Sequence, residues 1–184
     1  MNKLSLFLLC CLSMPVISFG QDLNTSQNVK TSNTIYQISV GLNTVNNLGT
    51  GSPLNSPGDW AFETPVILGV EARSFLNKDL AITLDLGFNK IDESTYYSLD
   101  GGLKYYLNDW IPLENFEFFV NGGLGVFNID KTDVSANVGG GVQYWFNDKF
   151  GVRLRGLGKF AFNAKENLFT NNHFQYNLEF VIVL

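Results

Sequence analysis

The stretch GVQYWFNDKFGVRLRG, residues 141–156, decides the fold of this chain. On both sides of Asn147, Asp148 and Lys149, apolar residues alternate with polar or small ones, and aromatic residues gather where the two runs meet. Such alternation is typical of β-strands, because successive side chains of a strand point to opposite faces. Asn and Asp tolerate the backbone geometry of tight turns. The stretch therefore predicts a β-hairpin with long arms and a very short turn.

The same pattern continues from Ile35 to the end of the chain. The stretches ARSFLNKDLAITL (72–84) and LKYYLNDWIPLENFEFF (103–119) repeat the figure of two strands around a link. No segment here has the 3.6-residue period of an amphipathic helix. We expect eight strands, at residues 35–43, 64–74, 80–89, 95–107, 116–127, 134–146, 150–162 and 173–184. We expect tight links near 75–79, 108–115 and 147–149, and the remaining links at 44–63, 90–94, 128–133 and 163–172, on the side of the longer loops.

The two faces of these strands differ in composition. One face consists of apolar and aromatic residues and glycine, with no charged residue on any strand. The other face is polar and rich in glycine, and it contains five acids and five bases, namely Glu71, Arg73, Asp85, Asp100, Lys104, Glu117, Arg153, Arg155, Lys159 and Glu179. An eight-stranded barrel has an interior that side chains just fill. We therefore expect the small and charge-paired residues inside, as a lumen network, and the large apolar residues outside.

An apolar outer surface on every strand requires lipid rather than water. An open sheet edge in lipid would leave backbone groups unpaired, so the sheet must close on itself. The pattern thus predicts an all-β fold, an eight-stranded antiparallel up-and-down transmembrane β-barrel with short periplasmic turns and longer outer loops. A soluble lipocalin-like barrel, the structural alternative, would carry many more charges on its polar face.

Aromatic residues cluster at the strand ends beside the tight links. They include Tyr105, Phe116, Phe118, Tyr144, Phe146 and Phe150, with Trp110 inside one link. Rings at one level are typical of the girdle that a membrane barrel places at the bilayer interface. The alternative is that aromatic residues simply favour strands.

The N-terminus has the form of a secretory signal peptide. Lys3 precedes an apolar run from Leu4 to Ile17, and Ser18 and Gly20 are small residues at the expected cleavage site. We expect residues 1–20 to be the signal peptide, residues 21–34 a disordered lead-in, and residues 35–184 the barrel. Both cysteines lie within the signal, so the mature chain has no disulfide or thiol chemistry.

With these features, the chain resembles the small eight-stranded outer-membrane barrels of Gram-negative bacteria, the OmpA/OmpX-like group. The resemblance covers residues 35–184 and includes the last strand, HFQYNLEFVIVL, which alternates in apolar residues but ends in Leu184 rather than the usual aromatic residue. It implies location in the outer membrane after cleavage near Gly20, contact with outer-membrane lipid and lipopolysaccharide, and recognition of the last strand by the barrel-insertion machinery. It also implies a monomer.

Several functional classes are disfavoured by composition. A formal net charge of −5 disfavours nucleic acid as a partner. His173 is the only histidine, and Gln175 stands where the His-x-Ser pattern of lipid A deacylases has serine, so we expect no catalytic residue. We expect no metal and no cofactor, because a metal site lacks a second histidine or a mature cysteine.

The function favoured by the sequence is a non-enzymatic outer-membrane barrel with a structural, adhesive or partner-binding role through its outer loops. Trp60 and Phe62 in the long first loop are the candidate contact residues. The alternatives are a narrow porin-like conduit for small solutes and a lipid A-modifying barrel enzyme. The charged lumen face allows either a gate, in which ion pairs exchange partners, or a static network that fills a closed core.

Overall fold

The computed structural model describes residues 34–47, 60–61, 63–73, 79–91, 94–129, 131–162 and 172–184. These residues form nine strands: β1 (Ile35–Asn47), β2 (Trp60–Ala61), β3 (Val66–Arg73), β4 (Leu80–Ile91), β5 (Ser94–Tyr106), β6 (Phe116–Ile129), β7 (Lys131–Trp145), β8 (Phe150–Ala161) and β9 (His173–Val183). In this part of the chain, no helix has the length and apolar character needed to cross a membrane. The predicted signal peptide and residues 21–33 of the predicted lead-in lie outside the described residues.

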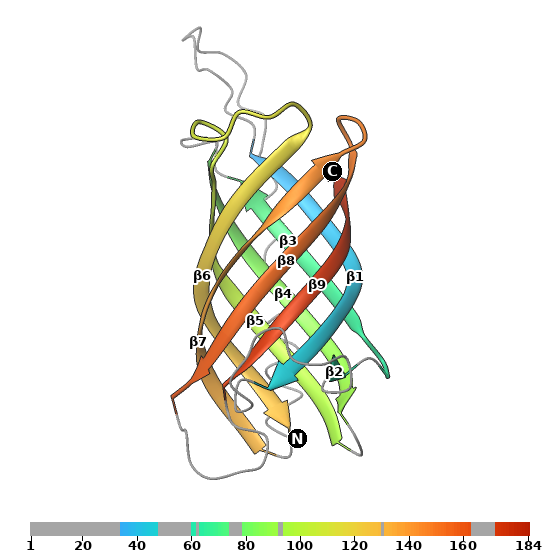
Figure 1. Ribbon diagram of the computed structural model, residues 1–184, viewed down its shortest axis with the longest axis vertical. Helices are drawn as coiled ribbons and strands as arrows, with labels where there is room; N and C mark the ends of the chain where they lie inside the picture. Colours follow the sequence, from blue (N-terminus) through green and yellow to red (C-terminus); the bar gives the residue numbers. More distant parts are fainter. Residues whose placement is uncertain are drawn as a thin grey trace, which may run out of the picture. The chain divides into compact units, whose positions relative to one another are not determined.

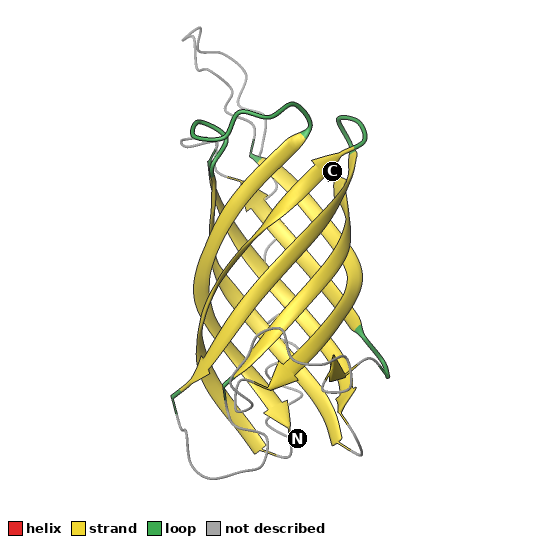
Figure 2. Cartoon of the chain, in the orientation of Figure 1, coloured by secondary structure: helices red, strands yellow, loops and turns green. Residues whose placement is uncertain are grey.

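The eight long strands form a closed barrel (Figures 1 and 2). Each strand pairs antiparallel with its neighbours in the order β1-β3-β4-β5-β6-β7-β8-β9, and β9 pairs back with β1 from Gln37↔Val183 to Asn47↔His173. The two-residue β2 pairs with β1 on the edge that faces β3, beyond the end of β3, where Ala61 and Trp60 pair with Val45 and Asn46. The predicted fold class, an eight-stranded antiparallel up-and-down barrel, is confirmed.

The barrel has two distinct ends. One end of the barrel, at the top of Figure 1, contains the start of β1, the end of β9 and the links β3–β4, β5–β6 and β7–β8. We call it the turn end. The other end is the loop end. Only residues 92–93 separate β4 from β5, and only residue 130 separates β6 from β7.

These two loop-end connections are shorter than the predicted links at 90–94 and 128–133. The strands run further than predicted because polar residues such as Lys90 and Asn128 still pair their backbone, with Thr95 and Thr132. By contrast, the β5–β6 link at the turn end extends over residues 107–115. The loop end therefore has the longer connections only at residues 48–65 and 162–172.

The outer wall of the barrel is apolar. Large aliphatic side chains in the middle of the strands are about half exposed, including Leu103 (53%), Leu124 (59%) and Leu154 (56%). Their sequence neighbours on the opposite face, such as Lys104 and Arg155, are almost fully buried. This alternation places the uncharged face outward and the charged face in the lumen, which is the arrangement of a barrel that crosses a bilayer.

Aromatic side chains lie on the outer face at both ends of this apolar wall. At the turn end Phe116 packs on Tyr144 with ring centroids 4.8 Å apart, as part of the predicted girdle. At the loop end Phe88 and Tyr97 pack at 5.8 Å, and Phe160, Phe174 and Tyr176 extend this second band, which the sequence analysis did not identify.

The spacing of the two bands fits a membrane. Tyr97 and Tyr105 lie on the outward row of β5, eight residues apart. That separation is about 27 Å along a strand and about 20 Å across a bilayer at a tilt of about 40°, close to the apolar height of about 25 Å in such barrels. In the β5–β6 link, Trp110 is 77% exposed beyond the turn-end band.

Candidate functional site: the lumen and its turn-end mouth

The central layer of the lumen is a network of ion pairs around two arginines of β8. Arg155 lies 2.6 Å from Asp85 of β4 and 3.0 Å from Glu179 of β9. Arg153 lies 2.9 Å from Glu71 of β3 and 3.5 Å from Glu179. Each guanidinium thus holds two carboxylates from different strands, a task that its planar fork of donors suits.

Polar neighbours satisfy the remaining groups of this central layer. Lys104 of β5 donates to Glu71 at 2.5 Å. The Ser39 hydroxyl donates to Glu179 at 2.6 Å, and Arg153 donates to Gln143 at 2.7 Å and to Gln37 at 3.2 Å. Charges that are removed from water must be paired and hydrogen-bonded in this way to avoid a large desolvation cost.

Two further ion pairs lie toward the ends of the barrel. On the loop-end side, Lys159 contacts Asp100 at 2.6 Å, and Asn137 donates to the same carboxylate at 2.8 Å. At the turn end, Arg73 contacts Glu117 at 2.8 Å. The structure therefore brings all ten charged residues singled out in the sequence into the lumen, and each of them has at least one oppositely charged partner within 4 Å.

The lumen is closely packed beside Asp85 and Asp100. The cavity bounded by Asp85, Asp100, Asn121, Asn137 and Leu157 has a volume of about 10 Å³, which is at most the space of one water molecule. Glycine makes this packing possible. A Cβ atom on Gly125 would lie 2.1 Å from Asp100 Oδ1 and 2.7 Å from Asn137 Nδ2, so only glycine leaves room for this part of the network.

His173 lies inside the barrel rather than on its surface. Its side chain is fully buried at the loop end of the lumen, where Nε2 lies 2.9 Å from the Tyr96 hydroxyl. The Tyr96 oxygen also accepts from Lys159 at 3.0 Å, and the His173 ring packs on Phe127 with centroids 4.7 Å apart. Period-two parity already assigns His173 to the polar face, so its burial follows from closure of the barrel around that face.

The proposed loop contacts remain predictions. The backbone of Trp60 forms part of β2, while its side chain and the whole of Phe62 lie outside what the structure describes. No group of three or more His, Cys, Asp or Glu residues suited to a metal ion occurs among the described residues.

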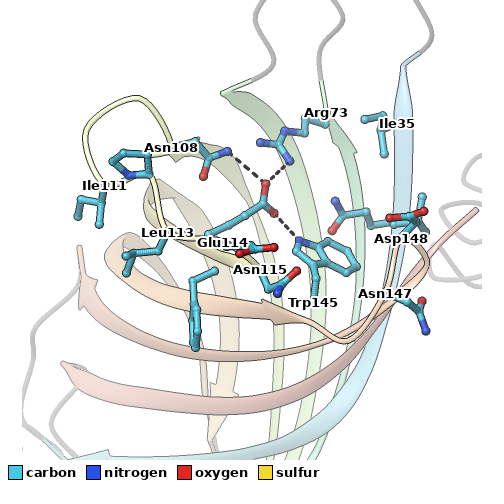
Figure 3. Close-up of a pocket in the computed structure, with 15 residues that line it drawn as sticks. Ile35, Arg73, Asn108, Ile111, Leu113, Glu114, Asn115, Trp145, Asn147 and Asp148 are labelled. Atoms are coloured by element: carbon cyan, nitrogen blue, oxygen red, sulfur yellow. Dashed lines mark hydrogen bonds and ion pairs between the residues drawn. The ribbon is translucent and has the colours of Figure 1, made fainter.

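The turn end opens into a pocket that the sequence analysis did not identify. It has a volume of about 710 Å³ and lies between the ends of β1, β3, β6, β7 and β9 and the two links 107–115 and 146–149 (Figure 3). Its lining consists of Ile35, Gln37, Arg73, Asn108, Ile111, Pro112, Leu113, Glu114, Asn115, Phe116, Glu117, Trp145, Asn147, Asp148 and Val183.

Glu117 organises the floor of this turn-end pocket. Its carboxylate accepts from Arg73 at 2.8 Å, from Asn108 at 3.2 Å and from the Trp145 indole at 2.8 Å, as the dashed lines of Figure 3 show. The Arg73 guanidinium also stacks on the ring of Tyr106, with its carbon 3.9 Å from the ring centroid. The sequence signal that could have found this pocket is the length of the 107–115 link.

Comparisons with known proteins agree with this architecture. No protein-family model matches the chain, and no curated protein matches it. Among solved structures, the chain is similar to the N-terminal β-barrel domain of Pseudomonas aeruginosa OprF, with a TM-score of 0.54 and 15% identity over 83% of this chain and 100% of that one. It is also similar to Neisserial surface protein A, with a TM-score of 0.53 and 13% identity over 80% of this chain and 94% of that one.

Identities this low show the fold alone. That fold agrees with the closed eight-stranded sheet and the apolar outer wall of this chain. The chain therefore has the fold of the small eight-stranded, OmpA/OmpX-like outer-membrane β-barrels.

Proposed function

We propose that this chain is an integral protein of a Gram-negative outer membrane whose barrel is a closed, non-conducting scaffold. The barrel holds the loop-end segments at the cell surface, where they have a structural, adhesive or partner-binding role. In this orientation the turn end faces the periplasm, and the apolar wall contacts lipid and the acyl chains of lipopolysaccharide. The last strand, β9, is the segment that the insertion machinery recognises.

The observation that carries this proposal is the packing of the lumen. Arg155 and Arg153 each bind carboxylates from two strands, and the cavity beside Asp85 and Asp100 has a volume of only about 10 Å³. Ions need a continuous hydrated path, and the paired charges at hydrogen-bond distance occupy the lumen at this level. The proposal thus favours a static network over a gate and a scaffold over a conduit.

Conductance tests the closed scaffold against the conduit. The full chain is refolded in detergent, its folded state is verified by heat-modifiable migration on a denaturing gel, and it is inserted into planar lipid bilayers. We expect no current above the leak of protein-free bilayers. Discrete steps that scale with the amount of inserted protein would establish the conduit instead.

The lumen offers little support for the alternative that this barrel is a lipid A-modifying enzyme. His173, the chain's single histidine, is fully buried and bonded to Tyr96, so a lipid substrate at the outer wall does not reach it. Mass spectra of lipid A from cells with and without the protein test this directly, and identical spectra are expected.

The surface role is tested by removing residues 48–59 between β1 and β2, which keeps every described strand. Attachment of cells that express this variant is compared with attachment of cells that express an equal amount of the intact, heat-modifiable protein. We expect reduced attachment if the role is adhesion. Unchanged attachment would favour the structural role instead. That role is then tested by measuring envelope integrity under detergent stress in cells with and without the protein.

A further inference from the structure

The apolar outer wall contains a groove across β1, β3 and β4. At its centre is Ala72 of β3, whose direct cross-strand partners are Tyr36 of β1 and Ile82 of β4. Side chains of directly paired residues lie beside each other on one face of a sheet. The small methyl group of alanine between a tyrosine ring and an isoleucine therefore leaves a depression. The groove has a volume of about 320 Å³, at the lower end of the range of ligand pockets.

The side chains that face this groove are apolar. Besides the row of three residues around Ala72, its lining includes Ile38, Val70, Leu84 and Leu184. Gln37, Glu71 and Thr83 also adjoin the groove, but their side chains are buried on the lumen face. The groove thus offers hydrocarbon surface, together with the hydroxyl group of Tyr36.

Two other small residues of the outer wall are covered by aromatic rings. A Cβ atom on Gly156 would lie 3.4 Å from the ring of Tyr176, and one on Gly158 would lie 3.2 Å from the ring of Phe160. Beside Ala72, by contrast, the described residues leave the space open. Ile82 is accordingly 64% exposed, whereas Leu86 on the same outward row of β4 is 41% exposed.

The groove extends from the turn end into the part of the wall that faces hydrocarbon. Tyr36 is the second residue of β1, and Ile82 pairs with Leu103 in the middle of the outward row of β5. A tyrosine at the end of the wall places its ring against acyl chains and its hydroxyl among the headgroups. The hydrocarbon core of a bilayer contains no water. An apolar groove at this depth is therefore filled by hydrocarbon.

From these features together we propose that the groove binds one acyl chain of a phospholipid. The chain packs on Ala72 between Tyr36 and Ile82, and the Tyr36 hydroxyl donates to an ester oxygen of the same lipid. The choice of phospholipid over lipopolysaccharide rests on the proposed function, in which the turn end faces the periplasm, because phospholipid forms the periplasmic leaflet of an outer membrane.

Native mass spectrometry of the full chain tests this proposal. The chain is refolded in a maltoside detergent, its folding is verified by heat-modifiable migration, and palmitoyl-oleoyl phosphatidylethanolamine is added. We expect one lipid to remain bound at collision energies that remove the detergent and all other lipids. Release of every lipid at the same energy as the detergent overturns the proposal.

A substitution that fills the groove locates the lipid. Ala72→Phe places a ring in the depression, and we expect it to lower the lipid-bound fraction about tenfold. Ala136→Phe is the matched control, because Ala136 is on the outward row of β7 and outside the lining, and it is expected to retain the lipid. Equal retention in the two folded variants overturns the site.

A second variant adds no bulk to the wall. Ile82→Ala lowers one side of the groove, and we expect it to weaken retention about fourfold, equivalent to one methylene group removed from contact. Leu86→Ala, on the same row of β4 but outside the lining, is the control and is expected to bind normally. The same loss in both variants would show that the lipid is held by the wall in general and would overturn the site.

Two other occupants of the groove are distinguished by the same measurement. A dimer that Ala72→Phe converts to monomer, with the bound lipid unchanged, would identify a second copy of the chain and overturn the proposal. Retention of lipid A in preference to the phospholipid would overturn the choice of lipid. Because the experiment is done in detergent, its failure leaves the closed scaffold intact, and currents in planar bilayers would leave the lipid site intact.

Discussion

Arg155 of β8 and Asp85 of β4 are 2.6 Å apart, although three strands separate them around the barrel in either direction. The two residues therefore join opposite walls through the centre of the lumen. Their contact spans the lumen at the level where Arg155 also binds Glu179. A pair in this position is expected to contribute to the stability of the barrel and, in the proposed closed scaffold, to obstruct passage along its axis.

Removal of this arginine is expected to be costly. Arg155→Met leaves the carboxylates of Asp85 and Glu179 without this cation in a buried site, and breaking a buried pair in this way costs about 3–5 kcal/mol. Urea unfolding of the refolded barrel, followed by tryptophan fluorescence, measures the loss. Lys90→Met, which breaks the exposed contact of Lys90 with Glu63, is the control and is expected to cost at most about 1 kcal/mol. Equal losses would mean that the lumen is hydrated.

A charge placed on the outer wall should destabilise the barrel more when it lies closer to the bilayer midplane. Leu103 lies in the middle of the outward row of β5, and Leu103→Arg is expected to cost about 2–4 kcal/mol if the site is near the bilayer midplane. Thr95→Arg, on the same row at the loop end, is expected to cost about 0–1 kcal/mol. Unfolding in phospholipid vesicles measures both variants. If Thr95→Arg cost as much as Leu103→Arg, the apolar belt would be misplaced.

Glycine is required at particular positions of the lumen. Gly125→Ala would place Cβ 2.1 Å from Asp100 Oδ1 and should displace this carboxylate from Lys159, at a cost of about 1–3 kcal/mol. Gly122→Ala is the matched control on the outer wall of the same strand, where the nearest atom is 3.7 Å from the added Cβ. We expect its effect to stay within about 0.5 kcal/mol. The heat-modifiable gel shift, recorded against temperature, compares the two.

Lysine reactivity distinguishes the two faces without mutation. Lys104 and Lys159 are fully buried in the lumen, whereas Lys131 and Lys149 are exposed at opposite ends of the barrel. A bulky amine-reactive reagent applied to the folded protein should modify the exposed pair and spare the buried pair, as peptide mass spectrometry detects. Modification of Lys104 before unfolding would contradict a filled lumen. Boiled protein, in which all four react, is the control.

The face assignment could be predicted from sequence because strand periodicity is local. Residues such as Leu103 and Lys104 are adjacent in the chain and must point to opposite sides of a strand, whatever the fold. The ten lumen charges follow from that rule and from the limited interior of an eight-stranded barrel. The hairpin patterns at residues 141–156 and 72–84 likewise predict that the two strands of each hairpin are antiparallel neighbours.

Other features depended on relations that no local pattern contains. Period-two parity placed His173 on the polar face, but only closure of the sheet brought Tyr96 and Lys159 into contact with it. The second aromatic band was not identified, because Phe160 and Phe174 reach the same end of the wall as Phe88 and Tyr97 only once the sheet closes. Strand ends were misjudged at 92–93 and 130, where polar residues continue to pair through their backbone.

The sequence by itself determined that this chain is a two-faced β-sheet with an uncharged outside and a charge-balanced inside, because side-chain direction along a strand alternates in every context. Only the tertiary structure decided which charges meet, because pairs such as Arg155 and Asp85 depend on the tilt and register of strands that lie across the barrel from each other. The turn-end pocket was decided in the same way, since it is lined by residues from five strands and two links that come together only when the sheet closes.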